Sequence, residues 1–176
     1  NPIGIRYLLL STHYRDPLNF TENSLKQAEN TVKNYNDFYK GLNICAAEIY
    51  NEKIKSEIEK ARNSFIESLD DDLNISGALS GVFNLIKKVN IFFSKGEMGR
   101  KNVFEVKEFL EDIDNVLCIL EKKEENLPEE ILNLIKEREK ARKEKDFKKA
   151  DLIRDKLKEK GIILEDTPYG TRWKRI

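Results

Sequence analysis

The last 39 residues, from Arg138 to Ile176, read REKARKEKDFKKADLIRDKLKEKGIILEDTPYGTRWKRI and decide the fold of the C-terminal part of the chain. Asp146 is a residue type that caps helix starts, and Gly161 is a type that ends helices. Between them, apolar residues recur at helical spacing. The stretch therefore predicts a helix from Phe147 to Lys160.

A hairpin is predicted after that helix. Pro168-Tyr169-Gly170 has proline where a tight turn needs a fixed φ and glycine directly after it. The flanking residues 162–167 and 171–174 then form two short antiparallel strands. Upstream, Pro128 suits the first turn of another helix, which we expect to run to about Lys145.

The remainder of the chain has the apolar periodicity of amphipathic helices. Thr21 and Asn74 are candidate N-caps, and Gly77 and Gly81 would let a neighbouring helix approach closely. The spacing predicts helices at about residues 3–11, 21–42, 44–69, 75–94 and 103–120. The fold class we expect is an all-α helical bundle with a small C-terminal helical unit that ends in a short β-hairpin.

Composition is typical of charge-rich helices. Charged residues make up 36% of the 176 residues and hydrophobic residues 39%, and no apolar run is long enough to span a membrane. Cys45 and Cys118 lie far apart and form no C-x-x-C pair, so we expect reduced thiols in a reducing, cytoplasmic compartment. Because the chain begins with Asn1 rather than Met, we expect it to be part of a longer polypeptide.

The formal net charge of zero conceals an uneven distribution. Residues 127–176 hold 15 Lys and Arg against 11 Asp and Glu, a net charge of +4, and the preceding residues hold 17 against 21, a net charge of −4. A local basic surface is expected of a nucleic-acid contact, although a solvated helical face fits a charge of this size as well.

Three stretches of the sequence resemble segments of cysteinyl-tRNA synthetases, and they occur in the same order as in that family. The C-terminal residues 138–173 are similar to that family's R-x-x-A-R-x-x-[KR]-[DN]-[FW]-x-x-A-D-x-I-R-D and G-I-x-L-E-D-T-P-x-G-T-x-W. Residues 5–20, IRYLLLSTHYRDPLNF, resemble the segment that leads from the family's catalytic domain into its helical bundle. Residues 70–79, DDDLNISGAL, resemble a motif in the bundle named DALR.

This resemblance implies a domain plan and a function. Residues 1–20 would be the connector from the absent catalytic domain, 21–126 the DALR-type bundle, and 127–176 the anticodon-binding domain. The whole enzyme would attach L-cysteine to tRNA(Cys) with ATP and Mg²⁺ and use a zinc ion to select cysteine. The chain contains neither HIGH nor KMSKS and no cluster of zinc ligands, so we expect no cofactor, no catalytic residue and no activity in this part alone.

Recognition of an anticodon sets the chemistry of the candidate site. Unstacked bases in RNA loops are read on their Watson–Crick edges by carboxylates and guanidinium groups and are stacked on aromatic rings. The resemblance implies Arg142, Asp151 and Asp166 as the readers of a GCA anticodon, with Phe147 and Trp173 as aromatic platforms. Arg154, Arg172, Lys174 and Arg175 are the candidate phosphate contacts.

Each of these residues also has a structural interpretation. Asp151 and Arg154 are spaced to form an ion pair on one helix, and Asp166 is placed to cap the turn that follows it. Phe147 and Trp173 fit the packed core as well as a stacking role. In the opening segment, His13 is expected to be hydrogen-bonded within the fold, and Arg15 is an alternative RNA contact.

A different class of function fits the same composition. The chain would then be a non-catalytic helical module that binds RNA or a protein and is not attached to a synthetase. HIGH and KMSKS motifs upstream in the same coding sequence would decide between the two hypotheses.

Overall fold

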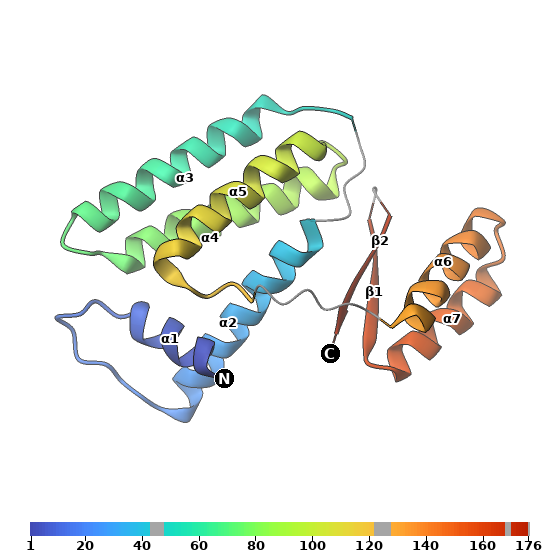
Figure 1. Ribbon diagram of the computed structural model, residues 1–176, viewed down its shortest axis with the longest axis horizontal. Coiled ribbons are helices and arrows are strands. Elements are labelled where there is room, and N and C mark those ends of the chain that lie inside the picture. The colour runs from blue at the N-terminus through green and yellow to red at the C-terminus, as the bar shows by residue number, and fades with distance from the viewer. Residues whose placement is uncertain (43–47, 122–127, 168–169, 176) are drawn as a thin grey trace. The chain divides into compact units, whose positions relative to one another are not determined.

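The computed structural model describes residues 1–42, 48–121, 128–167 and 170–175. Helices dominate this described part, and its strands are a single antiparallel pair near the C-terminus, as predicted (Figure 1). The chain divides into two compact units. We call Asn1–Glu121 the bundle unit and Lys122–Ile176 the C-terminal unit.

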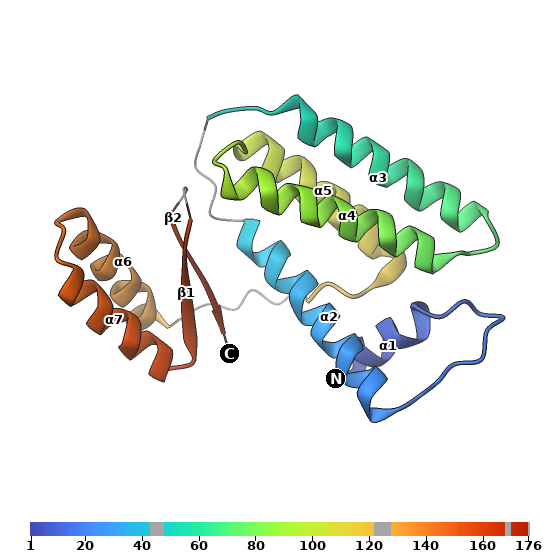
Figure 2. The same cartoon turned by 180° about the vertical axis from the view of Figure 1, so that it is seen from behind.

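The described residues of the bundle unit form five helices. They are α1 (Pro2–Leu10), α2 (Glu22–Gly41), α3 (Glu52–Asp70), α4 (Ile75–Ser94) and α5 (Arg100–Leu117). Helix α1 packs on α2, and α3 packs on both α4 and α5. Figures 1 and 2 show α3, α4 and α5 lying alongside one another from both sides. The predicted helical bundle is therefore confirmed.

Side-chain caps fix where these helices begin. The Thr21 hydroxyl accepts a hydrogen bond from the Ser24 backbone N–H, and the Ser24 hydroxyl accepts one from the Thr21 N–H, which makes a reciprocal capping box. Asn74 Oδ1 accepts from the Gly77 N–H at the start of α4. Both predicted N-caps are confirmed.

Two predicted helix ends were wrong. The helix predicted over residues 44–69 is not helical at residues 48–51, and α3 begins at Glu52 because the Asn51 carboxamide caps the helix by accepting the Lys53 N–H. The expected start at Ile44 lies outside the described residues. Helix α5 ends at Leu117 and not at Leu120. There the chain turns through a left-handed Cys118 with φ of 51°.

A buried carboxylate explains the end of α5. Asp114 accepts hydrogen bonds from the backbone N–H groups of Ile119 and Leu120, at 2.7 and 2.9 Å. Those N–H groups lie beyond the end of the helix and make no helical hydrogen bond, so the carboxylate supplies their acceptor inside the protein. The segment after α5 therefore stays buried without being helical.

Close contact between α3 and α4 depends on two glycines. A Cβ atom on Gly77 would lie 2.9 Å from Ser68 Oγ, and one on Gly81 would lie 3.0 Å from Ser64 Oγ. Since van der Waals contact requires more space than this, a side chain at either position would force the facing serine of α3 to move. The predicted close approach at these glycines is confirmed.

The opening segment is tied to the turn between α3 and α4. His13 Nε2 lies 3.1 Å from the Asp72 carbonyl oxygen, the Tyr14 hydroxyl donates to Asp72 Oδ1, and Arg15 pairs with Asp72 Oδ2 at 3.0 Å. The hydrogen-bonded role expected for His13 is confirmed. Asp72 and Leu73 both have positive φ, so these contacts hold a backbone turn that L residues rarely adopt.

The described residues of the C-terminal unit form two helices and two paired strands, which are α6 (Glu129–Lys143), α7 (Phe147–Glu159), β1 (Ile162–Thr167) and β2 (Gly170–Arg175). Helix α6 packs on α7, and α7 packs on β1. Its apolar core consists of Ile131, Ile135, Ile153, Leu157 and Ile162. Among the described residues of both units, no helix has the length and apolarity needed to cross a membrane.

Candidate nucleic-acid interface

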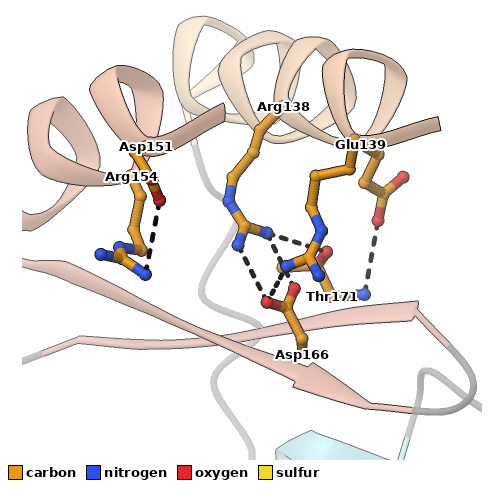
Figure 3. Close-up of polar contacts among 7 residues, drawn as sticks. Arg138, Glu139, Asp151, Arg154, Asp166 and Thr171 are labelled. Atoms are coloured by element: carbon orange, nitrogen blue, oxygen red, sulfur yellow. Dashed lines mark hydrogen bonds and ion pairs between the residues drawn. The ribbon is translucent and has the colours of Figure 1, made fainter. Parts of the chain in front are cut away.

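Asp166 lies at the turn end of the hairpin, where β1 pairs with β2. Its register partner on β2 is Thr171. Arg138 reaches both strands from α6, because its guanidinium donates to Asp166 Oδ1 and Oδ2 at 2.9 and 3.0 Å and lies 3.4 Å from Thr171 Oγ1 (Figure 3). The neighbouring Glu139 accepts the Thr171 backbone N–H at 3.4 Å. Helix α6 therefore holds the hairpin at one register position.

A second arginine meets the same carboxylate from the solvent side. Arg142, one turn after Arg138 on α6, donates from Nη1 to Asp166 Oδ2. The two arginines differ in burial, since 3% of the Arg138 side chain is exposed and 43% of the Arg142 side chain. Asp166 itself is 44% exposed. Two of the three predicted base readers, Arg142 and Asp166, thus contact each other, and the side chains of both stay partly exposed.

The two guanidinium groups hold Asp166 in its ionised form. The hydrogen bond from Arg138 is the main reason that the pKa of Asp166 lies below its usual value, and the positive charges of Arg138 and Arg142 act in the same direction, against partial desolvation. The same hydrogen bond raises the pKa of Arg138. At neutral pH this carboxylate is therefore a hydrogen-bond acceptor only.

Asp151 and Arg154 form the surface ion pair that their spacing predicted. Arg154 Nη1 lies 3.6 Å from Asp151 Oδ1 on α7, and both side chains are more than half exposed. The negative charge of Asp151 also contributes to the raised pKa of Arg138. An exposed pair of this kind is weak, and both groups remain accessible to a ligand.

Phe147 is 61% exposed, so the expectation that it packs in the core was wrong. Each helical residue advances by about 100°, which places Phe147 about 120° around α7 from the buried Ile153. The same rotation places Phe147 within about 40° of Asp151 and about 20° of Arg154. An aromatic ring, a carboxylate and a guanidinium therefore share one exposed face of α7.

Trp173 packs on the core of the C-terminal unit, with part of its surface buried. It faces Leu164 in the hairpin register, and both side chains lie against the buried apolar cluster. The packing role is therefore observed, and a stacking role for Trp173 stays a prediction.

The remaining predicted phosphate contacts lie on β2. The backbones of Arg172, Lys174 and Arg175 pair with Glu165, Ile163 and Ile162. The side chains of these three basic residues lie outside the described part of the structure. A turn-capping role for Asp166 over residues 168–169 likewise falls outside it.

Arg138 is the site residue that sequence reasoning missed. It matches the first arginine of the R-x-x-A-R pattern, and its spacing of four from Arg142 places both side chains on one side of α6. This spacing in the sequence indicates that Arg138 and Arg142 belong to the same site. Among the described residues, no group of three or more His, Cys, Asp or Glu side chains is arranged to hold a metal ion.

Two segments of the chain match models of known protein families. Residues 124–173 match the family model described as the cysteinyl-tRNA ligase anticodon binding domain, and residues 64–121 match the model described as the DALR domain. These two domains define the class as the tRNA-recognition domains of an aminoacyl-tRNA synthetase.

The names of similar curated proteins indicate which aminoacyl-tRNA synthetase is concerned. Proteins named cysteine–tRNA ligase from Shouchella clausii, Oceanobacillus iheyensis and Caldicellulosiruptor saccharolyticus are 40%, 38% and 36% identical to the chain. The alignments cover 99%, 99% and 100% of this chain and 39% of each relative. The chain belongs to the cysteine–tRNA ligase family, and it spans about two fifths of the length of these relatives.

Proposed function

We propose that this chain is the tRNA-recognition part, DALR bundle plus anticodon-binding domain, of an enzyme that attaches L-cysteine to tRNA(Cys) with ATP. The main support is the partly exposed Asp166 side chain, which Arg138 and Arg142 hold in the domain that matches the anticodon-binding model. The comparisons favour this function over a helical module unconnected with any synthetase.

The geometry supplies complementary chemistry for bases. An ionised carboxylate accepts N–H donors, and guanine and cytosine both present such donors on their Watson–Crick edges. Arg142 donates to base carbonyl oxygens, ring nitrogens or phosphates. Phe147 offers a ring for stacking beside Asp151 and Arg154 on the exposed face of α7.

Binding requires a change of partner at Arg142. In the free protein this arginine is bonded to Asp166, so the two predicted readers satisfy each other. Arg142 is partly exposed and makes this contact through one guanidinium nitrogen, whereas Arg138 uses two. Exchange of Arg142 onto the RNA therefore costs less than exchange of Arg138 and frees a lone pair on Asp166.

The reaction itself belongs, in this proposal, to the rest of the ligase. Zinc, ATP and Mg²⁺ are implied by the family resemblance, and the described residues contain no cluster that fits a zinc ion. We therefore place cysteine activation in a catalytic domain of the same cytoplasmic polypeptide. The chain alone should bind tRNA(Cys) without charging it.

RNA binding by the 176-residue chain tests this function. A fluorescent RNA hairpin with a GCA anticodon loop is titrated against the wild type, Asp166→Asn and Arg142→Gln. Each variant should bind about 1 to 3 kcal/mol more weakly, because a base or carboxylate partner is left unpaired. Hairpins with altered anticodon loops are the control, and equal affinity of the wild type for all loops would contradict anticodon reading.

A further inference from the structure

Arg138 is buried, charged and committed to one carboxylate. Its guanidinium and the Asp166 carboxylate form two nearly parallel hydrogen bonds of 2.9 and 3.0 Å, the fork-to-fork arrangement that fixes both distance and orientation. Only 3% of the Arg138 side chain is exposed, whereas 44% of the Asp166 side chain is, so Asp166 is the member of the pair that remains accessible to a ligand.

We propose that Arg138 is a positioning residue for base recognition, which acts through Asp166 by holding its carboxylate in one orientation with its outer lone pairs available. This inference rests on the proposed anticodon reading and adds to it a residue that contacts no base. A carboxylate offers about four acceptor positions, of which Arg138 takes two and Arg142 one. The open position and the one that Arg142 vacates serve the base.

A role in stability alone does not account for this arginine. Its buried Nε–H has no hydrogen-bond partner among the described residues, and an orphaned buried donor is destabilising. Buried ion pairs are often no more stabilising than apolar residues of similar volume. The unpaired Nε–H is thus tolerated beside a two-fold pairing that fixes the direction of the carboxylate, which is what a reader of planar base edges needs.

A lysine at position 138 could not orient the Asp166 carboxylate as Arg138 does. A lysine ammonium is a point charge on a flexible stem, whereas the guanidinium plane sets the plane of the carboxylate. Arg138→Lys therefore keeps a cation near Asp166 but removes the orientation. Arg138→Gln removes both.

The test is a double-mutant cycle in which base discrimination is measured for each variant. The measured quantity is the Kd for an RNA hairpin with adenine in place of guanine divided by the Kd for the hairpin with the GCA loop. Arg138→Gln, Arg138→Lys and Asp166→Asn should each lower this ratio about tenfold or more. Adding Arg138→Gln to Asp166→Asn should lower it no further, because the arginine acts only through the carboxylate.

Lys160→Gln is the matched control. Lys160 also lies in the C-terminal unit and pairs with a carboxylate, Glu130 at 2.9 Å, but this pair is exposed and away from the hairpin turn. The variant loses one positive charge, so both hairpins should bind somewhat more weakly with an unchanged ratio. Circular dichroism and Trp173 fluorescence establish that each variant is folded.

The possible results separate the two proposals. If the wild type does not discriminate between the hairpins, anticodon reading fails and this inference fails with it. If the wild type discriminates and Arg138→Gln leaves the ratio unchanged, or lowers it independently of Asp166→Asn, only the positioning role is overturned. If Arg138→Gln does not fold, Arg138→Lys decides, and unfolding of both variants would show that Arg138 is structural.

The pH profile of the ratio gives a second readout. Asp166 faces Arg138 and Arg142 of α6, with Glu139 of α6 and Asp151 of α7 nearby. Without Arg138 the carboxylate takes up a proton at a higher pH, so discrimination by Arg138→Gln should begin to fall at a higher pH than that of the wild type. Identical profiles would contradict the positioning role.

Discussion

At the scale of single residues, Asp166 combines two properties that usually exclude each other. Its carboxylate is held firmly in the ionised form by Arg138, and close to half of its surface is nevertheless in solvent. An exposed carboxylate is normally loosely oriented, and a well-oriented one is normally buried. The buried fork of Arg138 removes this conflict, because it orients the group from the protein side only.

The stability of the C-terminal unit should depend on pH through Asp166. Its folded-state pKa is lowered, so its contribution is fully present above the unfolded-state pKa of about 3.9 and is lost as pH falls through the lower folded-state value. Asp166→Asn lacks this contribution. The wild type should therefore melt a few degrees higher than the variant at neutral pH, and melting curves should converge below about pH 4. A gap that stays constant to pH 2 would contradict this assignment.

The exposed ring of Phe147 should matter for RNA and not for folding. Phe147→Ala should change the free energy of unfolding by less than about 0.5 kcal/mol, since a surface position is altered. It should weaken binding of the GCA hairpin by about 1 to 3 kcal/mol through loss of stacking. Phe104→Ala is the matched control, because Phe104 is 65% exposed on α5 of the bundle unit. Equal binding by the two variants would exclude Phe147 from the interface.

At the scale of helices and strands, the sequence is most informative where the physics is local. Thr21, Asn74 and Asp146 were predictable as caps because a cap and its N–H partner are at most three residues apart. The hairpin was predictable because its turn residues restrict the backbone directly. The pairing of Arg138 with Asp166 was not, because it joins residues 28 positions apart.

Buried polar residues of the bundle unit show the same limit. Asn36 of α2 donates to the Ile119 carbonyl oxygen and accepts the Glu121 N–H, at 3.0 and 2.6 Å. In the sequence it is one more asparagine in a polar helix, and only the position of the segment after α5 reveals its role. Likewise, Phe147 has helical spacing to Ala150, but the edge of the apolar stripe could not be located from spacing alone.

The Asn36 contacts predict a destabilising substitution. Asn36→Leu should lower the free energy of unfolding of the bundle unit by about 1 to 3 kcal/mol, because the Ile119 carbonyl and the Glu121 N–H lose a buried partner. Asn34→Leu on the same helix is the control, since Asn34 is exposed. Denaturant unfolding followed by far-UV circular dichroism measures both variants. Equal stabilities would mean that water satisfies those backbone groups.

At the scale of the whole molecule, the chain divides into two compact units, and the C-terminal unit has an apolar core of its own. The C-terminal unit of Lys122–Ile176 is small, and units of this size are only marginally stable. The chain has a single tryptophan, Trp173, which packs on the core of this unit. Fluorescence therefore reports on the C-terminal unit, whereas circular dichroism reports mostly on the longer helices of the bundle unit.

The two signals should separate when the smaller core is weakened. Leu157 is fully buried in the C-terminal unit, and Leu157→Ala should destabilise it by about 2 to 5 kcal/mol. In denaturant titrations, the fluorescence transition should move to much lower concentration while most of the circular dichroism transition stays in place. A joint shift of both signals would show that the two units unfold together.

The contacts from His13, Tyr14 and Arg15 to Asp72 have a mechanical consequence. They fasten the opening segment to the turn between α3 and α4, some sixty positions further along the chain. Tension applied at the first residue would pass through these contacts to the turn that joins α3 and α4, as well as through α1 to α2. The opening segment should therefore stay attached to the bundle under force until the contacts to Asp72 break.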